Sequence, residues 1–388
     1  CGCAGLDRMK GGLSRRMTLF SELEDERGWP TISLDVGGLC KSFGRQAELK
    51  FHTTVEAMTL MDYSAIGLGG NDLRLPAQEL YARTTNTGST RSPFLSANVA
   101  VYGFALEDMR PYDVIEKNGW KIGVTSVLGD QAREELNNTD IETASAHDQL
   151  SQIVPQMRDE QCDALILLAY ATMEETEALA EAYPYFNIIA TSSGDYEPPA
   201  RPRQVNGVRT VLVEVGEKGM NAVVFGFYSE PEKQIRYQRV PLDSRFEAAA
   251  KAKMLMEQYQ EQLQVIGFEG LGLRPSPHID AETNGNFVGS KACDSCHGDS
   301  YDVWKESGHS HAWATLRDLD PPRIYDPECV SCHVVGWDPE EYFPYESGFW
   351  NEETTPKLVN VGCESCHGPG ENHIDAEIRG DEPTKLSM

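Results

Sequence analysis

Short apolar runs alternate with amphipathic stretches over the first 240 residues of the chain. The runs have the length of strands, and they lie at residues 31–38, 63–70, 120–129, 163–170, 186–191, 208–216 and 222–228. Between them, residues 144–158 and 173–182 show the spacing of three and four that indicates amphipathic helices. This alternation of strand and helix predicts an α/β layered sandwich.

The pattern changes after residue 243. Apolar residues recur every three or four positions between Ala252 and Ile266, in a stretch rich in Ala, Glu, Gln and Lys, which predicts one amphipathic helix of about six turns. Glycine and proline are dense at 267–278 and indicate a linker. We therefore expect an α/β domain at 1–243, a connecting helix and linker at 244–278, and a small, mostly helical or irregular domain at 279–388.

The charge balance excludes some partners. The 388 residues include 61 Asp and Glu against 34 Lys and Arg, a net charge of -27. Such a surface repels the phosphates of nucleic acids and the headgroups of anionic lipids, so nucleic acid is not an expected partner and basic proteins fit better. No apolar run approaches the roughly 20 residues of a transmembrane helix.

Six of the ten cysteines fall within three C-x-x-C-H units, CDSCH at 293–297, CVSCH at 329–333 and CESCH at 363–367. In such a unit the two thiols attach one haem covalently, and the adjacent histidine binds the iron as its proximal ligand. The units predict three haem c groups, attached at Cys293, Cys296, Cys329, Cys332, Cys363 and Cys366, with His297, His333 and His367 as proximal ligands. A zinc ribbon is the alternative, because paired cysteines and histidines also suit tetrahedral zinc, but it leaves the fixed place of the histidine unexplained.

A second axial histidine would complete the coordination of each iron. Apart from the proximal residues, the chain offers His278, His309, His311, His373, His52 and His147. The first four belong to the haem region and are the candidates, whereas we expect His52 and His147 to be surface residues. His373 lies too close in sequence to His367 to reach the opposite face of the same porphyrin easily. We therefore expect it to bind the iron of a neighbouring haem, with one of His309 or His311 as a second donor and His278 as the reserve.

The haem region also resembles a known family. The segments FVGSKACDSCHGDSYDVWKESGHSHAWATL (287–316), CVSCHVVGW (329–337) and GVGCESCHGPGENH (361–374) together resemble the multihaem cytochrome c-554 type. The resemblance implies haems close enough for electrons to pass between irons, and distal ligands drawn from the histidines after the first and third units. Many relatives carry a fourth C-x-x-C-H downstream, and this sequence reaches Met388 without one.

The N-terminal segments resemble a second family. SLDVGG (33–38), YSAIGLGGNDL (63–73) and GWKIGVTSVLG (119–129), in this order, are similar to the 5′-nucleotidase-like metallophosphoesterases, whose Asp, Asn and His ligands hold two metal ions. The corresponding positions are Gly38, Gly70, Asn71, Asp72, Leu73, Tyr170, Ser192 and Gly194. Only Asn71 keeps a ligand of that family, so the resemblance implies a retained fold with a dismantled hydrolytic site.

The remaining cysteines leave several interpretations open. Cys1 and Cys3, with Cys40 after the strand that ends at Gly38, could form a thiol site for a soft metal such as Cu(I) or zinc. A lipid anchor at Cys1, a disulfide from Cys40 to one of the pair, and ordinary buried thiols are the alternatives. Cys162, beside the apolar run DALILL, is expected in the core.

Covalent haem attachment occurs outside the cytoplasm in bacteria, so we expect an exported protein, periplasmic or at the cell surface. A chain that begins at cysteine fits a lipoprotein, and it equally fits a trimmed sequence. The favoured function is electron transfer between redox proteins, such as other multihaem cytochromes. The competing hypothesis is an oxidoreductase in which a five-coordinate haem or the thiol site acts on a small sulfur or nitrogen compound. A hydrolase fused to a cytochrome is a third hypothesis, against which the missing metal ligands argue.

Overall fold

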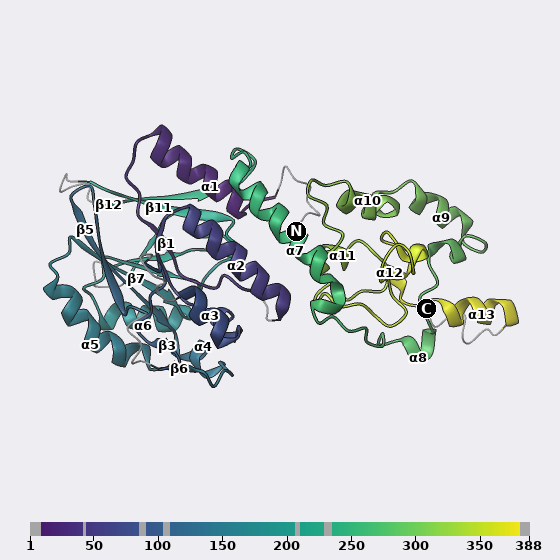
Figure 1. Cartoon of the computed structure of the whole chain (residues 1–388), viewed down its shortest axis with the longest axis horizontal. Helices are drawn as coiled ribbons and strands as arrows, with labels where there is room; N and C mark the ends of the chain where they lie inside the picture. Colours follow the sequence, from purple (N-terminus) through teal and green to yellow (C-terminus); the bar gives the residue numbers. More distant parts are fainter. Residues whose placement is uncertain are drawn as a thin grey trace. The chain divides into compact units, whose positions relative to one another are not determined.

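The computed structural model describes residues 9–41, 44–84, 91–103, 109–205, 210–228 and 235–380. Its contacts divide the chain into two compact units, Cys1–Leu255 and Met256–Met388, and each is described by itself (Figure 1). The division falls within the segment 244–278, in which the sequence predicts a connecting helix and linker.

A mixed sheet forms the centre of the N-terminal unit. Within the described residues it has six strands, in the order β4-β5-β7-β8-β10-β9. The four inner strands are parallel, and β4 and β9 pair antiparallel at the two edges. The bounds are β4 Tyr112–Lys117, β5 Trp120–Leu128, β7 Ala164–Tyr170, β8 Ile188–Thr191, β9 Arg203–Gln204 and β10 Val211–Glu214.

Both faces of this sheet are covered, because successive side chains of a strand point to opposite sides. Leu165 and Leu167 of β7 share one core with the helices α5 (Ala146–Asp159) and α6 (Met173–Ala182). Ile166 belongs to the other core, which is shared with further strands. Those strands are β1 Ser33–Asp35, β2 Tyr63–Ile66, β11 Asn221–Phe227 and β12 Ile235–Pro241. They pair as β1 with β2, in parallel, and β11 with β12, antiparallel.

A second layer of helices covers the outer side of β1 and β2. Phe51, Val55 and Leu80 pack there with Ile66 and Leu68 in one buried cluster. The helices are α1 Leu13–Ser21, the π-helical turn η3 Glu22–Glu26, α2 Arg45–Leu60 and α3 Ala77–Thr84. Smaller elements complete the unit: η4 Asp72–Arg74, β3 Val99–Val101, α4 Asp130–Glu134 and β6 Ile141–Thr143. The unit is thus built of four layers, with helices on the two outer sides and strands in the two inner layers, which confirms the predicted α/β layered sandwich.

The expected helix from residue 244 begins later, as α7 (Ala250–Gly270). The side chain of Asp243 accepts the backbone N–H of Arg245 at 3.1 Å and so holds a turn before the helix. Near the other end, Gly267 has a positive φ of 63°, which interrupts the helical conformation at the first residue of the expected linker.

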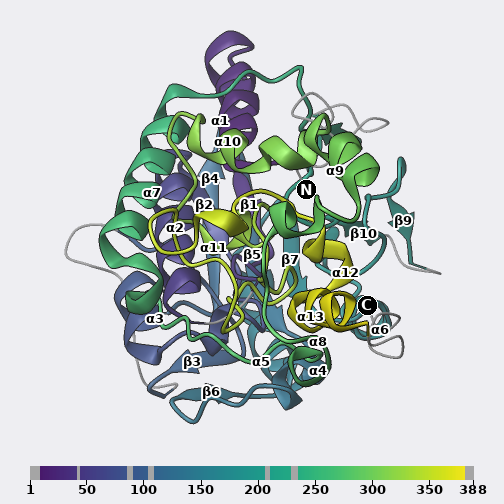
Figure 2. The same ribbon diagram turned by 90° about the vertical axis from the view of Figure 1, so that its right-hand side faces the viewer.

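The C-terminal unit is made of short helices and irregular chain, as its sequence predicts (Figure 2). Its buried cluster includes Phe287, Trp313, Val335, Trp337 and Phe349. The helices are α8 Ala281–Asn284, η6 Ser290–Cys293, α9 Gly298–Lys305, η7 Gly308–His311, α10 Ala312–Arg317, α11 Pro327–Val330, η8 Pro356–Leu358, α12 Glu364–His367 and α13 Glu371–Arg379. Within the described residues of the whole chain, no helix is both long and apolar enough to cross a membrane.

Candidate functional site

The three C-x-x-C-H segments each form a helical turn. In the first and third, the histidine N–H donates to the carbonyl of the first cysteine, at 2.9 Å for His297 and 3.1 Å for His367. In every segment the first cysteine is partly buried and the second is exposed, and none of the six forms a disulfide. The two thiols of each segment are therefore spaced by one turn and not oxidised to a disulfide, as covalent attachment to a porphyrin requires.

The ring of His333 is oriented by two contacts from one neighbouring segment. Its Nδ1 lies 2.6 Å from the carbonyl oxygen of Ala312 and 3.2 Å from the hydroxyl of Thr315. Because a carbonyl oxygen only accepts hydrogen bonds, Nδ1 carries the proton and donates to Ala312. This tautomer leaves the lone pair on Nε2, the arrangement found in metal-binding histidines.

The first and third segments lie next to each other. The Cys293 thiol lies near that of Cys363, and the Cys363 N–H donates to the Ser290 hydroxyl at 3.1 Å. Burial, together with the neighbouring Cys363, raises the pKa of the Cys293 thiol to about 12. Two of the predicted attachment residues, far apart in the sequence, thus meet in one place.

His373, which follows the third C-x-x-C-H segment, lies close to the histidine of the first one. Its ring centre is 6.2 Å from that of His297, and the two ring planes are inclined by 24°. Residue 373 belongs to α13, which follows the third unit, whereas His297 belongs to the first. The structure therefore brings together a predicted distal ligand and a predicted proximal ligand of different units.

The other histidines have different surroundings. His309 accepts the N–H of Val361 at its backbone carbonyl, at 3.2 Å, which places η7 beside the start of the third unit; His311 ends the same turn. The ring of His278 packs on Tyr345, with ring centres 4.7 Å apart. Its Nδ1 accepts the N–H of Asp280 at 3.1 Å, so in the neutral ring Nε2 carries the proton and presents no lone pair.

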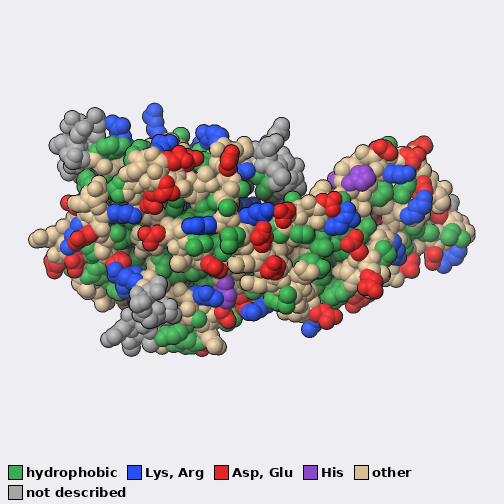
Figure 3. All heavy atoms as spheres, turned by 45° about the horizontal axis from the view of Figure 1, so that its top comes forward, with side chains coloured by type: hydrophobic (Ala, Val, Ile, Leu, Met, Phe, Trp, Pro, Cys, Tyr) green, Lys and Arg blue, Asp and Glu red, His purple; other side chains and the backbone are tan. Residues whose placement is uncertain are grey.

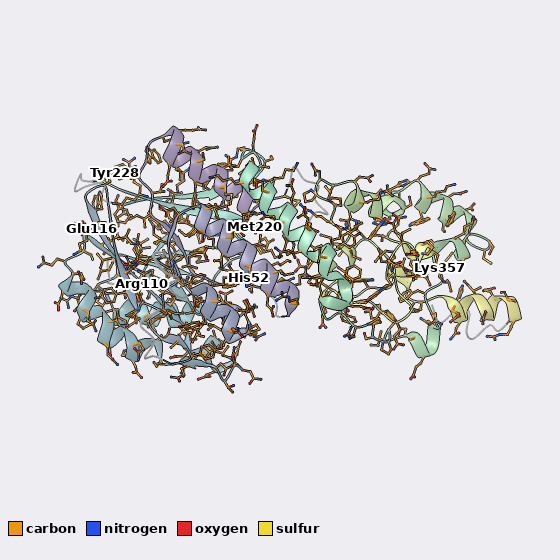
Figure 4. The ribbon with its side chains drawn as sticks, viewed as in Figure 1. His52, Arg110, Glu116, Met220, Tyr228 and Lys357 are labelled. Atoms are coloured by element: carbon orange, nitrogen blue, oxygen red, sulfur yellow. The ribbon has the colours of Figure 1, made fainter. Side chains whose placement is uncertain are left out.

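Two histidines belong to the N-terminal unit. His52, labelled in Figure 4, lies on α2 with its Nε2 2.9 Å from a carboxylate oxygen of Glu79, and burial lowers its pKa. The ring of His147 packs on Tyr183, with ring centres 5.4 Å apart. Neither lies in the unit that holds the attachment segments.

Asp72 fills the edge at which the metallophosphoesterase resemblance would place metal ligands. It has no exposed surface, and its carboxylate accepts the N–H groups of Gly38 at 2.7 Å, Cys40 at 2.8 Å and Gly69 at 2.9 Å. Burial raises its pKa to about 6, against the opposing effect of those three amides. The hydrogen bonds of this carboxylate therefore go to backbone amides, and they fix the two loops that contribute those amides.

The ring of Tyr170 takes up further space at this edge. A Cβ atom built at Gly38 would lie 2.8 Å from Cε2 of Tyr170, and one at Gly69 would lie 2.6 Å from the same atom. The surviving Asn71 donates its side-chain N–H to the carbonyl of Lys41 at 3.2 Å. Near Ser192 and Gly194, Glu214 accepts the N–H of Asp195 at 2.9 Å. No group of three or more His, Cys, Asp or Glu side chains within the described residues is arranged to hold a metal ion.

The predicted thiol site falls partly outside the described residues, which begin after Cys1 and Cys3. Cys40 is buried, and this burial raises the pKa of its thiol well above the usual range. Since the other two thiols lie outside the described residues, the metal interpretation stays a prediction. Cys162 is partly buried and packs at the margin of the core that contains Leu165 and Leu167.

The two units can now be assigned to classes. The C-terminal unit carries three C-x-x-C-H segments of the kind found in c-type cytochromes, and the N-terminal unit has a metallophosphoesterase-like fold. Residues 292–368 match the model of the family described as Cytochrome c554 and c-prime. The chain is also 39% identical over 108 residues to cytochrome c-554 of Nitrosomonas europaea, a match that covers 24% of this chain and 41% of that protein.

Solved structures resemble the N-terminal part. The sulfate thiohydrolase SoxB of Thermus thermophilus in complex with glycerol has a TM-score of 0.56 at 16% identity, over 67% of this chain and 48% of that one. A 5′-nucleotidase precursor of Thermus thermophilus has 0.52 at 15%, over 66% and 54%. A putative 5′-nucleotidase of Staphylococcus aureus has 0.51 at 14%, over 93% and 67%. Identities this low show the fold alone.

The buried carboxylate of Glu364 is not among the residues that the sequence predicts to be functional. It lies inside the third attachment unit and is 2% exposed. The only signal is an acidic residue between the two cysteines, and its bonds depend on amides that other segments bring to it. The sequence marks Asp72 only as a lost metal ligand, because its bonds to amides depend on the meeting of two loops.

The raised pKa of Asp72 predicts a pH-dependent stability of the N-terminal unit. Between about pH 4 and pH 6 the folded chain holds this proton and the unfolded chain releases it, so the contribution of Asp72 to stability should fall by about 3 kcal/mol as the pH rises through this window. Hydrogen exchange of peptides in β1 and β2 reports the stability of wild type and of Asp72→Asn. The stability of wild type relative to the variant should decrease as the pH rises from 4 to 6. Asp159→Asn, at an exposed residue, is the control, and a difference that stays flat from pH 4 to pH 7 would contradict the prediction.

We also expect no metal-dependent phosphoesterase activity. Glycine at positions 38 and 194 offers no side-chain ligand, and Tyr170 fills space beside Gly38, so two cations have too few donors. Purified protein with added Mn²⁺ should not release phosphate from nucleotides or generic phosphate esters. Hydrolysis that requires the metal and disappears in Asn71→Ala would overturn this expectation.

Proposed function

We propose that this chain is an exported multihaem c-type cytochrome, which transfers electrons between redox partners through three covalently bound haems. The observation that carries the proposal is the set of three C-x-x-C-H segments, each a helical turn whose two cysteines form no disulfide. The match of residues 292–368 to the cytochrome family supports it. When bound, each haem supplies an iron that takes up and releases one electron.

The residues of the chain would divide the work as follows. Each porphyrin would be held by two cysteines of one segment: Cys293 and Cys296, Cys329 and Cys332, or Cys363 and Cys366. His297, His333 and His367 would bind the irons. The hydrogen bond from His333 to Ala312 fixes a tautomer in which Nε2 is the ligating atom. The hydrogen bond from the Cys363 N–H to the Ser290 hydroxyl keeps the first and third sites close, which favours rapid electron transfer between them.

His373 is the proposed distal partner of His297. A metal–imidazole bond is about 2 Å long and the ring centre lies about 1 Å further on, so imidazoles on opposite sides of one metal ion have their centres about 6 Å apart. The 6.2 Å between these rings fits that distance, and nearly parallel planes are compatible with a shared iron. For the second and third sites we propose His309 or His311 as a further donor, with His278 in reserve.

The charge of the C-terminal unit supports a basic partner. Residues 256–388 contain 25 Asp and Glu against 8 Lys and Arg, a net charge of -17 in about a third of the chain. Acidic side chains are frequent on the face shown in Figure 3, with fewer basic ones between them. Such a surface steers basic redox proteins toward the haem unit and repels acidic ones. Periplasm or cell surface is the location we propose, since haem attachment of this type occurs there.

An oxidoreductase acting on a small sulfur or nitrogen compound is the second candidate. It gains support from His278, because the N–H of Asp280 occupies its Nδ1 and the tautomer leaves no lone pair on Nε2. If His278 does not ligate, only His309 and His311, in one short turn, remain for two sites. An iron without a distal histidine could bind a substrate. A high-spin haem that binds cyanide, nitrite or sulfite would favour this candidate over the pure carrier.

Three covalent haems are the first expectation of the proposal. The intact mass should exceed that of the apoprotein by three haems, and the colour should resist extraction with acidified acetone, because the porphyrin is bound through thioethers. A pyridine haemochrome assay gives the count independently. A mass equal to apoprotein plus zinc would replace the proposal with a zinc ribbon.

His373→Ala should convert one haem from low-spin to high-spin without releasing it, since Cys293 and Cys296 still hold the porphyrin. Electron paramagnetic resonance and the optical spectrum report the change. His147→Ala, which removes a histidine of the N-terminal unit, is the control and should leave the spectra unaltered. If every haem stays low-spin in His373→Ala, His373 is not a ligand.

A further inference from the structure

Glu364 joins three segments of the C-terminal unit through its carboxylate. It is 2% exposed and accepts the backbone N–H groups of Val288 at 2.9 and 3.1 Å, Gly289 at 2.6 Å and Gly370 at 2.9 Å. The residue itself opens α12, the turn that contains Cys366 and His367. A single buried side chain thus satisfies amides from both sides of its own segment.

Each of the joined segments leads directly to a proposed haem-binding residue. Gly289 precedes η6, which ends at Cys293 of the first attachment unit. Gly370 precedes α13, which carries His373. Glu364 therefore connects the first unit, the third unit and the helix that presents His373 to His297.

The surroundings of this carboxylate leave little freedom for the segments. A Cβ atom at Gly289 would lie 2.5 Å from the carbonyl oxygen of Lys357, so the backbone there is closely covered. Lys357, labelled in Figure 4, donates its ammonium to the carbonyl of Phe287 at 3.3 Å and is the nearby cation. Burial raises the pKa of the Glu364 carboxyl, while the three amides and Lys357 favour its ionised form.

Glutamate suits this place better than its neutral analogue. All the groups that face the carboxylate are donors, and a carboxylate offers acceptors on both oxygens. The amide nitrogen of a glutamine would confront at least one N–H group and leave it unsatisfied, which in a buried site costs about 1–3 kcal/mol. The same exchange would also remove a negative charge close to two attachment units.

We propose that Glu364 is a positioning residue for electron transfer: its carboxylate sets the approach of the first and third attachment units and holds α13 so that His373 faces His297. This inference rests on the proposed function, since it assigns a role relative to bound haem. A buried anion at this place also stabilises the more positive, oxidised iron. Removing it should therefore raise the reduction potential of a neighbouring haem.

The test compares Glu364→Gln with His373→Ala in the full-length haem-loaded protein. Glu364→Gln should keep three attached haems, convert one of them wholly or partly to the same high-spin species as His373→Ala, and raise the midpoint potential in a spectroelectrochemical titration. The double variant should show no more high-spin haem than His373→Ala alone, because both changes act on one ligand. Glu353→Gln, the same chemical change at an exposed residue, should leave spectra and potentials unaltered.

The outcomes separate the two proposals. Three low-spin haems with unchanged potentials in Glu364→Gln would overturn the positioning role and leave the cytochrome proposal standing. A wild-type protein without covalent haem would overturn both. If Glu364→Gln does not accumulate, Glu364→Asp tests the same claim, because its shorter side chain keeps the charge but cannot span the three segments. It should then show the high-spin haem without the full rise in potential, and a spectrum identical to wild type would count against the proposal.

Discussion

Each of the two units contains a buried carboxylate that accepts hydrogen bonds from several backbone amides and so fixes the loops around its candidate site. Asp72 does this between the loops after β1 and β2, and Glu364 does it between two attachment units. Each gathers three N–H groups from chain that is not in regular secondary structure and would otherwise be unsatisfied in the interior. The irregular segments of this protein are fixed by such side chains, since the C-terminal unit has little regular core to do so.

The two units use this constraint toward opposite ends. In the N-terminal unit the carboxylate closes an edge, because its oxygens are committed to amides and an aromatic ring lies beside it. Among the described residues of this unit, no group of three or more His, Cys, Asp or Glu side chains is arranged to hold a metal ion. In the C-terminal unit the carboxylate links segments that are distant in the sequence and holds them at a fixed spacing. These segments carry cysteines and histidines of the predicted haem sites. One carboxylate thus occupies the edge of a sandwich, and the other links the segments that carry the cysteines and histidines.

Local patterns predicted most of the fold. The apolar runs that became β5 and β7, and the helices α5 and α6, are evident from periodicity alone. The helix α2 was missed because Thr53, Thr54 and Val55 in its middle lower helix propensity; burial of Phe51 and Met58 outweighs this preference. The attachment residues follow from their spacing. The bond between Cys363 and Ser290, 73 positions apart, depends on the tertiary fold and has no local signature.

The contact between Tyr170 and Gly38 couples these two positions. Gly38 has a φ of +78°, a conformation that side-chain-bearing residues rarely adopt, and any Cβ there would lie 2.8 Å from the tyrosine ring. A larger residue at position 38 would therefore fit only if the ring moved and the backbone relaxed. Substituting Tyr170 alone would remove packing at this edge without relieving the backbone of Gly38. The two positions can thus be redesigned together but not one at a time.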